Sequence, residues 1–166
     1  MKLTNFTDYG LRCLMYLTAY QDKLSTVKEI AEYYDISRNH LIKVVHRLSQ
    51  LKLIESTKGK GGGIRLADNM EKLRLGDIIK MLESNMNLVE CFNYENNTCK
   101  IAKTCQLRHY LYEAGQSFIN VLNKYTLADT SKNLKVESLL QLSSSRATNE
   151  FQYNNFYFSC HIVTVF

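Results

Sequence analysis

Two short amphipathic segments with a tight break between them, followed by a glycine-rich basic turn, constrain this chain more than any other feature. Residues 26–35 and 37–53 space their apolar side chains as helices do. Two short apolar runs, 53–56 and 64–66, then flank a turn that is rich in glycine, because a tight reversal needs positive φ. Helix, turn, helix and basic hairpin, in this order, predict a winged helix-turn-helix domain.

Further helices are expected on both sides of this motif. Residues 6–20 are apolar almost all round, as in a buried helix, with Thr7 or Asp8 as the predicted N-cap. Residues 75–83 are expected to form a connecting helix. With no proline and only seven glycines, the chain favours helices in general.

Capping residues set the expected starts of the two central helices. Ser25 and Thr26 precede the first of them, and Ser25 with Glu29 resembles a capped start. Ser37 is expected to cap the second. The apolar face of this second helix comprises Leu41, Val44, Val45, Leu48 and Leu51. Its opposite face presents Arg38, Asn39, His40, Lys43, Arg47 and Gln50.

That polar face has the chemistry of a DNA-reading helix. Arginine and lysine bond guanine in the major groove, and asparagine or glutamine bonds adenine. Lysines on the following turn are placed to reach phosphates or a minor groove. The predicted DNA contacts are Arg38, Asn39, His40, Lys43, Arg47, Lys58, Lys60 and Arg65.

Positive charge is concentrated in the same stretch. Between Arg38 and Arg65, seven basic residues face one acidic residue, Glu55, which gives +6 in a chain of net charge +5. The rest of the chain therefore carries −1. Focused positive charge predicts a polyanionic partner, double-stranded DNA, although a solvated basic face is the simpler alternative.

Three cysteines form a second motif. Cys91, Cys99 and Cys105 follow the pattern C-x7-C-x5-C in a polar segment without helical or strand periodicity. Thiolates grouped in this way, in a chain with no export signal, usually bind metal or sense redox state. A closed zinc site takes four ligands, and a cuboidal iron–sulfur cluster has four irons to hold. A fourth ligand is therefore missing, and the residues alone leave open a cluster, zinc or a thiol–disulfide switch.

A heptad stripe follows the cysteines. Apolar residues recur at alternating steps of four and three, which predicts a long helix that pairs with its twin in a homodimer. The alternative is a helix packed on its own domain. The stripe comprises Leu107, Leu111, Ala114, Phe118, Val121 and Tyr125.

The expected fold class is mainly α, with a winged helix-turn-helix, a small β-hairpin wing and a long C-terminal dimerisation helix. Residues 1–84 are expected to form the DNA-binding domain, and residues 85–105 the loop that would hold a cluster. Residues 106–142 supply the dimerisation helix and a C-terminal helix, and 143–166 form an atypical tail to which no function is assigned.

The sequence also limits location and activity. It shows neither an export-type leader nor an apolar run of about twenty residues, so we expect a cytoplasmic chain with reduced thiols and no membrane span. It shows no pairing of a nucleophile with a base, so an enzyme is not expected.

Several separate strings resemble one known family. TNFTDYGLRCLMYL, SRNHLIKVVHRLSQL and KGKGGGIRL occur in order, followed by the three cysteines and by KYTLAD at 124–129. Together they resemble the winged-helix family of regulators that includes the nitric-oxide-sensitive NsrR proteins and the cluster-assembly regulator IscR. The likeness runs from about residue 1 to 142. His109 lies four residues after Cys105, which favours the NsrR branch.

The resemblance implies a homodimer with an iron–sulfur cluster in each protomer, [4Fe-4S] or alternatively [2Fe-2S]. The loaded dimer would repress promoters of nitrosative-stress genes at inverted-repeat operators and release them when nitric oxide reacts with the cluster. The implied ligands are Cys91, Cys99, Cys105 and the partner subunit's Asp8, with Arg12 paired to that carboxylate. An N-cap role is the alternative for Asp8.

Two rival functions remain beside this one. The first keeps DNA binding and replaces the cluster with zinc or a thiol switch at the same cysteines. The second is an adaptor whose basic face docks an acidic protein. The x7 spacing between the first two cysteines is longer than the x5 of some relatives, but no ligand is lost.

Overall fold

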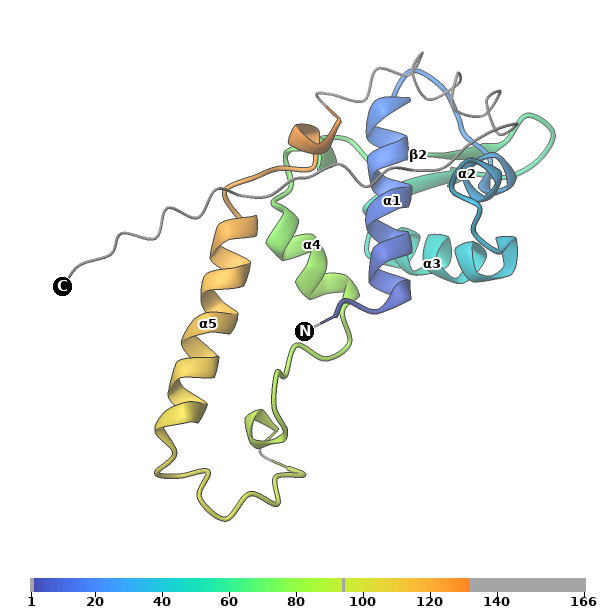
Figure 1. The fold of residues 1–166 in the computed structure, drawn as a ribbon. Coiled ribbons are helices and arrows are strands. Elements are labelled where there is room, and N and C mark those ends of the chain that lie inside the picture. Colours follow the sequence, from blue (N-terminus) through green and yellow to red (C-terminus); the bar gives the residue numbers. More distant parts are fainter. Residues whose placement is uncertain (1, 94, 132–166) are drawn as a thin grey trace, which may run out of the picture. The chain divides into compact units, whose positions relative to one another are not determined.

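Helix α1 (Asn5–Ala19) lies at the centre of the structure, a computed structural model that describes residues 2–93 and 95–131 (Figure 1). Its N-cap is Thr4, whose hydroxyl accepts a hydrogen bond from the amide of Thr7 at 3.2 Å. The predicted caps, Thr7 and Asp8, lie inside the helix, so that prediction was wrong. Extended backbone at Thr4, rather than at either later residue, brings a hydroxyl to the first free amides.

Helices α2 (Val27–Tyr34) and α3 (Arg38–Gln50) form the helix-turn-helix. Asp35 ends α2 in the left-handed conformation, with φ of 53°, and the amide of Ile36 then donates to the carbonyl of Ala31 at 2.9 Å. Ser37 occupies the N-cap position of α3, as predicted, but its side chain makes no capping hydrogen bond. The buried face of α3 packs on both α1 and α2.

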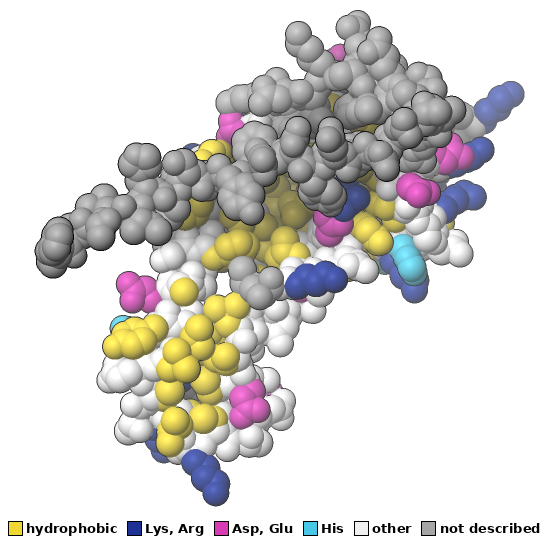
Figure 2. Space-filling view, in the orientation of Figure 1, with side chains coloured by type: hydrophobic (Ala, Val, Ile, Leu, Met, Phe, Trp, Pro, Cys, Tyr) yellow, Lys and Arg dark blue, Asp and Glu magenta, His cyan; other side chains and the backbone are white. Residues whose placement is uncertain are grey.

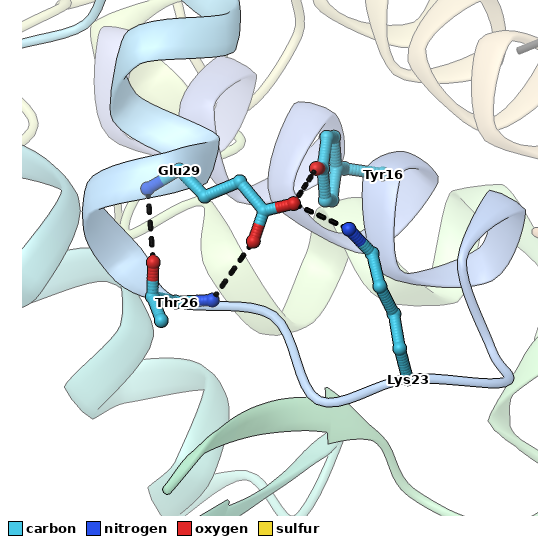
Figure 3. A network of polar contacts seen from close by, with 4 residues as sticks. All are labelled: Tyr16, Lys23, Thr26 and Glu29. Carbon is cyan, nitrogen blue, oxygen red and sulfur yellow. Dashed lines mark hydrogen bonds and ion pairs between the residues drawn. The ribbon is translucent and has the colours of Figure 1, made fainter. Parts of the chain in front are cut away.

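The start of α2 is fixed by Thr26 and Glu29 rather than by Ser25 (Figure 3). The amide of Glu29 donates to the Thr26 hydroxyl at 3.1 Å, and the amide of Thr26 donates to the Glu29 carboxylate at 3.4 Å. The same carboxylate accepts hydrogen bonds from the Tyr16 hydroxyl, at 2.7 Å, and from the Lys23 ammonium. Ser25 is buried instead. The Glu29 side chain therefore links α1, the turn that follows it and α2.

Glu29 makes this junction sensitive to acid. Partial burial raises the pKa of Glu29, but hydrogen bonds from Lys23, Tyr16 and Thr26 outweigh it and hold the pKa below its ordinary value. The stabilisation is therefore complete above the unfolded-state pKa, roughly 4.3, and is lost as pH falls through the folded-state value. Glu29→Gln is expected to cost about 1 kcal/mol in urea unfolding at neutral pH, and the difference should disappear as pH falls through the folded-state pKa of Glu29. If the difference in free energy of unfolding between the wild type and Glu29→Gln grew as pH fell, the proposed stabilising role of ionised Glu29 would be contradicted.

The wing consists of strands β1 (Ile54–Thr57) and β2 (Gly63–Leu66), which pair antiparallel with Ile54 opposite Leu66. Its turn contains Gly59 and Gly61 at φ of 102° and 81°, values that side chains other than glycine rarely adopt. The wing is attached to the domain through Ser25, whose backbone exchanges two hydrogen bonds with Ile64.

Helix α4 (Leu75–Leu82) packs against α1 on one side and helix α5 (Gln106–Leu122) on the other (Figure 1). Gly10 of α1 allows the first contact, because a Cβ there would meet the Leu82 side chain at 2.7 Å. Two short 3₁₀ helices, Met70–Lys72 and Ala128–Thr130, flank this pair in sequence.

The C-terminal end of α5 is tied to the N-terminal end of α4 by Asn123. Its side-chain oxygen accepts a hydrogen bond from the amide of Asp77 at 3.1 Å, and its side-chain nitrogen donates to the Asp77 carboxylate at 3.2 Å. Gly76 permits this approach, because a Cβ there would lie 2.4 Å from the Asn123 oxygen and 2.8 Å from the carbonyl oxygen of Ile119. We call this set of contacts the Asn123 clasp.

Backbone pairing extends the clasp into the core. The amide of Leu75 donates to the carbonyl of Tyr125 at 3.0 Å, and the amide of Leu127 donates to the carbonyl of Leu73 at 2.9 Å. Leu127 is only 1% exposed and joins the core of the winged helix. The segment that follows α5 therefore belongs to the core of the winged helix.

The predicted fold class is confirmed: the structure is mainly helical, with a two-stranded hairpin after a helix-turn-helix. Residues 132–142, where a C-terminal helix was expected, and the tail 143–166 lie outside the described residues.

Candidate DNA interface and cysteine loop

The outer face of α3 is polar and exposed. All five predicted contacts on this helix have exposed side chains, whereas its buried face is entirely aliphatic. These five are Arg38, Asn39, His40, Lys43 and Arg47. The face is therefore free to enter a groove of DNA while its opposite side holds the helix on the domain.

The structure adds two residues that the sequence analysis missed. His46 is exposed on the same outer face, one helical turn beyond Lys43, and Ile42 is exposed to 45%. The helical period alone would have located His46, since it lies three residues after Lys43 and four before Gln50. The same period places Ile42 four residues from both Arg38 and His46, but an apolar residue in a helix is usually assigned to the core.

The wing presents two lysines at its tip. Lys58 and Lys60 are exposed and take part in none of the ion pairs found among the described residues. Arg65 differs, because its guanidinium contacts the Glu55 carboxylate on the opposite strand at 2.6 and 2.8 Å. Lys58 and Lys60 are thus the wing cations best placed to neutralise phosphate.

The DNA-facing side of α3 continues onto the start of α1. His40 and Lys43 line a hollow of about 300 Å³ together with Asn5, Phe6 and Tyr9. Asp8 and Arg12 lie on the same helix α1, where the Arg12 guanidinium pairs with the Asp8 carboxylate at 2.8 Å.

The cysteine loop joins α4 to α5, and the helical turn among its described residues is the 3₁₀ segment Glu90–Phe92. Cys91 lies in that turn and is buried, whereas Cys99 and Cys105 are half-buried. All three are free thiols. Across residues 2–93 and 95–131, no three His, Cys, Asp or Glu side chains are grouped closely enough to hold a metal ion. The conformation of the loop therefore does not bring the three thiols together, nor Asp8 of the same chain to them.

Cys105 occupies a distinct position at the junction with α5. It is the N-cap residue of that helix, where the helix dipole favours negative charge. It also borders an open hollow of about 560 Å³, whose other walls include Phe92, Lys103, His109 and Tyr112. Space and positive charge therefore adjoin the third thiol.

Cys13 behaves differently from the loop cysteines. Its side chain in α1 is fully buried, and burial raises the pKa of the thiol to about 12. It remains a protonated thiol at neutral pH and acts as a small core residue.

Helix α5 carries an uncovered apolar stripe. Ile119 packs toward α4 and is 4% exposed, whereas Leu107 and Val121, on the predicted heptad stripe, are 61% and 50% exposed. Figure 2 shows hydrophobic side chains gathered along the lower left of the molecule, where α5 runs in Figure 1. Within the described part of the chain, no helix has the length and apolar composition needed to cross a bilayer.

Comparison with known proteins gives a consistent result. A family model described as Rrf2, iron-dependent transcriptional regulator, matches residues 3–133. The HTH-type transcriptional regulator NsrR of Bacillus subtilis is 48% identical over 134 residues, which cover 80% of this chain and 92% of that protein. NsrR of Halalkalibacterium halodurans is 48% identical over 144 residues, which cover 86% and 99%.

Solved structures share the fold. CymR, the global cysteine regulator of B. subtilis, has a TM-score of 0.63 at 26% identity and covers 79% of this chain and 96% of its own. IscR of T. potens has a TM-score of 0.65 at 23% identity, covers 82% and 90%, and supports the fold alone.

Proposed function

Because the chain belongs to the Rrf2 family of iron-dependent transcriptional regulators, we propose that it represses transcription at inverted-repeat operators and releases them when nitric oxide reacts with an iron–sulfur cluster in its cysteine loop. The observation that carries the DNA half is the exposed polar face of α3 beside the two free lysines of the wing. The cluster half is supported by three free thiols in one loop and by the likeness to NsrR proteins.

DNA binding follows from the placement of charge. In a winged helix, α3 enters a major groove, and the wing lies over the adjacent backbone or minor groove. Lys43 is at the centre of the α3 face, and Lys58 and Lys60 are at the tip of the wing. If about six phosphates per protomer are neutralised, the logarithm of affinity falls by about five per decade of salt.

Lys43→Ala is expected to weaken binding about tenfold, because it removes an exposed ammonium from the centre of the groove-facing surface. Binding to the best duplex from a randomised library, titrated at several salt concentrations, measures both effects. Lys72→Ala is the matched control, since Lys72 is an exposed lysine on the 3₁₀ turn Met70–Lys72. An affinity independent of salt would exclude groove docking.

A homodimer is supported by α5. Leu107 and Val121 leave an apolar stripe exposed along the helix, and a second copy of the same stripe would bury both. Two-fold symmetry then presents two α3 helices to two half-sites, which is why the operator should be an inverted repeat.

The donor set in the loop fits an iron–sulfur cluster. Thiolate sulfur is the ligand that such clusters prefer, and Cys91, Cys99 and Cys105 supply three. The loop is held by few regular elements, so gathering the thiols leaves the core intact, and open space already adjoins Cys105. We propose the partner subunit's Asp8 as the fourth ligand and [4Fe-4S] as the cluster. When bound, the cluster supplies iron that reacts with nitric oxide.

The protein's own residues hold the proposed fourth ligand and connect it to α3. Asp8 is held by Arg12 through an exposed ion pair on α1, so its carboxylate is oriented yet accessible. An oxygen donor would bind cluster iron less strongly than a thiolate, so a small ligand would displace it more easily. Because Asp8 lies on α1, against which α3 packs, loss of its bond to the partner's loop would alter the packing that positions α3.

Asp8→Ala is expected to change the visible spectrum of anaerobically purified protein and to shorten the lifetime of the cluster, because one of four ligands is lost. Its effect on folding is small, since an exposed i,i+4 ion pair contributes about 0.5 kcal/mol. Asp22→Ala, another exposed acid, is the control. Unchanged spectra and an unchanged response to nitric oxide would remove Asp8 from the ligand set.

A further inference from the structure

Ile42 is an exposed aliphatic residue in the middle of the DNA-facing helix. Its side chain is 45% exposed, whereas the other four aliphatic side chains of α3 are at most 9% exposed. Those four are Leu41, Val44, Val45 and Leu48. The core is therefore complete without Ile42.

The fold gives no reason for isoleucine at this position. A β-branched residue is a weaker helix former than lysine, glutamine or alanine, and on an exposed helix position packing does not compensate. Exposure also leaves apolar area in contact with water. The Ile42 side chain would therefore be stabilised by a contact with another molecule that removes its apolar surface from water.

The surroundings of Ile42 indicate what that contact is. Arg38 lies one turn before it and His46 one turn after it, and both are exposed. Asn39 and Lys43 adjoin it on the same outer face. Ile42 is thus an apolar spot among groups that hydrogen-bond base edges.

We infer that Ile42 determines part of the DNA specificity by contacting the C5-methyl group of thymine in the major groove. This methyl is the one apolar group that base pairs display there, and packing it against isoleucine removes both surfaces from water. The inference rests on the proposed DNA binding and names one base that the surface selects. Ile42 is the aliphatic side chain that α3 leaves exposed beside these polar neighbours.

Replacement of thymine by uracil tests the contact, because uracil lacks only the methyl group. The probe is the strongest-binding duplex recovered from a randomised library with the full-length protein, together with copies in which one thymine at a time is uracil. At the contacted position, uracil is expected to weaken wild-type binding about fourfold, the effect of one buried methyl group. Ile42→Ala should bind the thymine and uracil duplexes equally, and Ile42→Val should retain most of the preference.

Two results would overturn the inference. One is a wild-type protein indifferent to uracil at every position, and the other is an Ile42→Ala variant that keeps the full preference, even if its dimerisation changes. Failure of the proposed DNA function looks different, because the wild type would then recover no sequence from the library and bind without salt dependence. A change in overall affinity without a change in the thymine-to-uracil ratio also counts against a methyl contact.

Discussion

Protein carrying Cys99→Ser is expected to leave anaerobic purification nearly colourless and with iron close to the level of cluster-free protein. Serine oxygen is a hard donor that stays protonated at neutral pH, so it does not replace a thiolate in an iron–sulfur site. Cys99 is the most informative of the three positions. Cys91 is buried, so its replacement also alters packing, and Cys105 is the N-cap residue of α5, where serine would add a capping hydroxyl and change the stability of the helix.

The measurement is the visible spectrum with iron and sulfide content, before and after addition of nitric oxide. Cys13→Ala is the matched control: it removes a cysteine that lies in the core of α1, so the colour should be retained. Equal colour and iron in Cys99→Ser and the wild type would show that this thiol is not a ligand. A colourless wild type with stoichiometric zinc would favour the zinc or thiol switch over the cluster.

Gly76→Ala is expected to lower the free energy of unfolding by about 2 kcal/mol, a large part of the stability of a small domain. The added methyl would lie 2.8 Å from the carbonyl oxygen of Ile119, and helical backbone cannot yield as a flexible side chain does. It would also displace the Asn123 side chain from the amide of Asp77. Urea unfolding of the purified protein, at fixed protein concentration, measures the change.

Gly115→Ala provides a control of the opposite sign. Gly115 also lies within a helix, but a Cβ there meets only the Leu88 side chain, at an ordinary contact distance of 3.5 Å. The substitution should therefore raise the free energy of unfolding by up to about 1 kcal/mol, as glycine-to-alanine changes in helices do. If both variants were stabilised, the close approach of α4 and α5 would be contradicted.

The winged helix was predictable because its signals are local. Apolar spacing in 26–35 and 37–53, and glycines in the wing turn, each report on a few neighbouring residues. The N-cap of α1 was predicted wrongly for the same reason. Thr4, Thr7 and Asp8 are all capable caps, and only the backbone conformation at Thr4 selects one of them.

The clasp and the state of the loop were not predictable. Asn123 and Asp77 are separated by 46 residues, and no periodic pattern links them. Gly76 in isolation signals only a cost to a helix, and its reason appears when α5 is in place. The type and spacing of the cysteines predicted a metal or redox site. The distances between their sulfur atoms, however, depend on a loop without repeating backbone geometry. Ile42 was missed because its apolar type suggests the core, whereas its position on the helical wheel indicates that it is exposed.

Because the Asn123 clasp holds only one end of α5, the helix is a lever with its fulcrum at Asn123. Its 17 residues span about 25 Å, so a rotation of about 10° at the fulcrum moves the Cys105 end by about 4 Å. The same geometry applies in the opposite direction: a displacement of several ångströms at the thiols corresponds to a small rotation of α4 against α1. In the proposed sensor, a displacement at the thiols is therefore expected to reach α1, on which α3 packs, as a much smaller rotation.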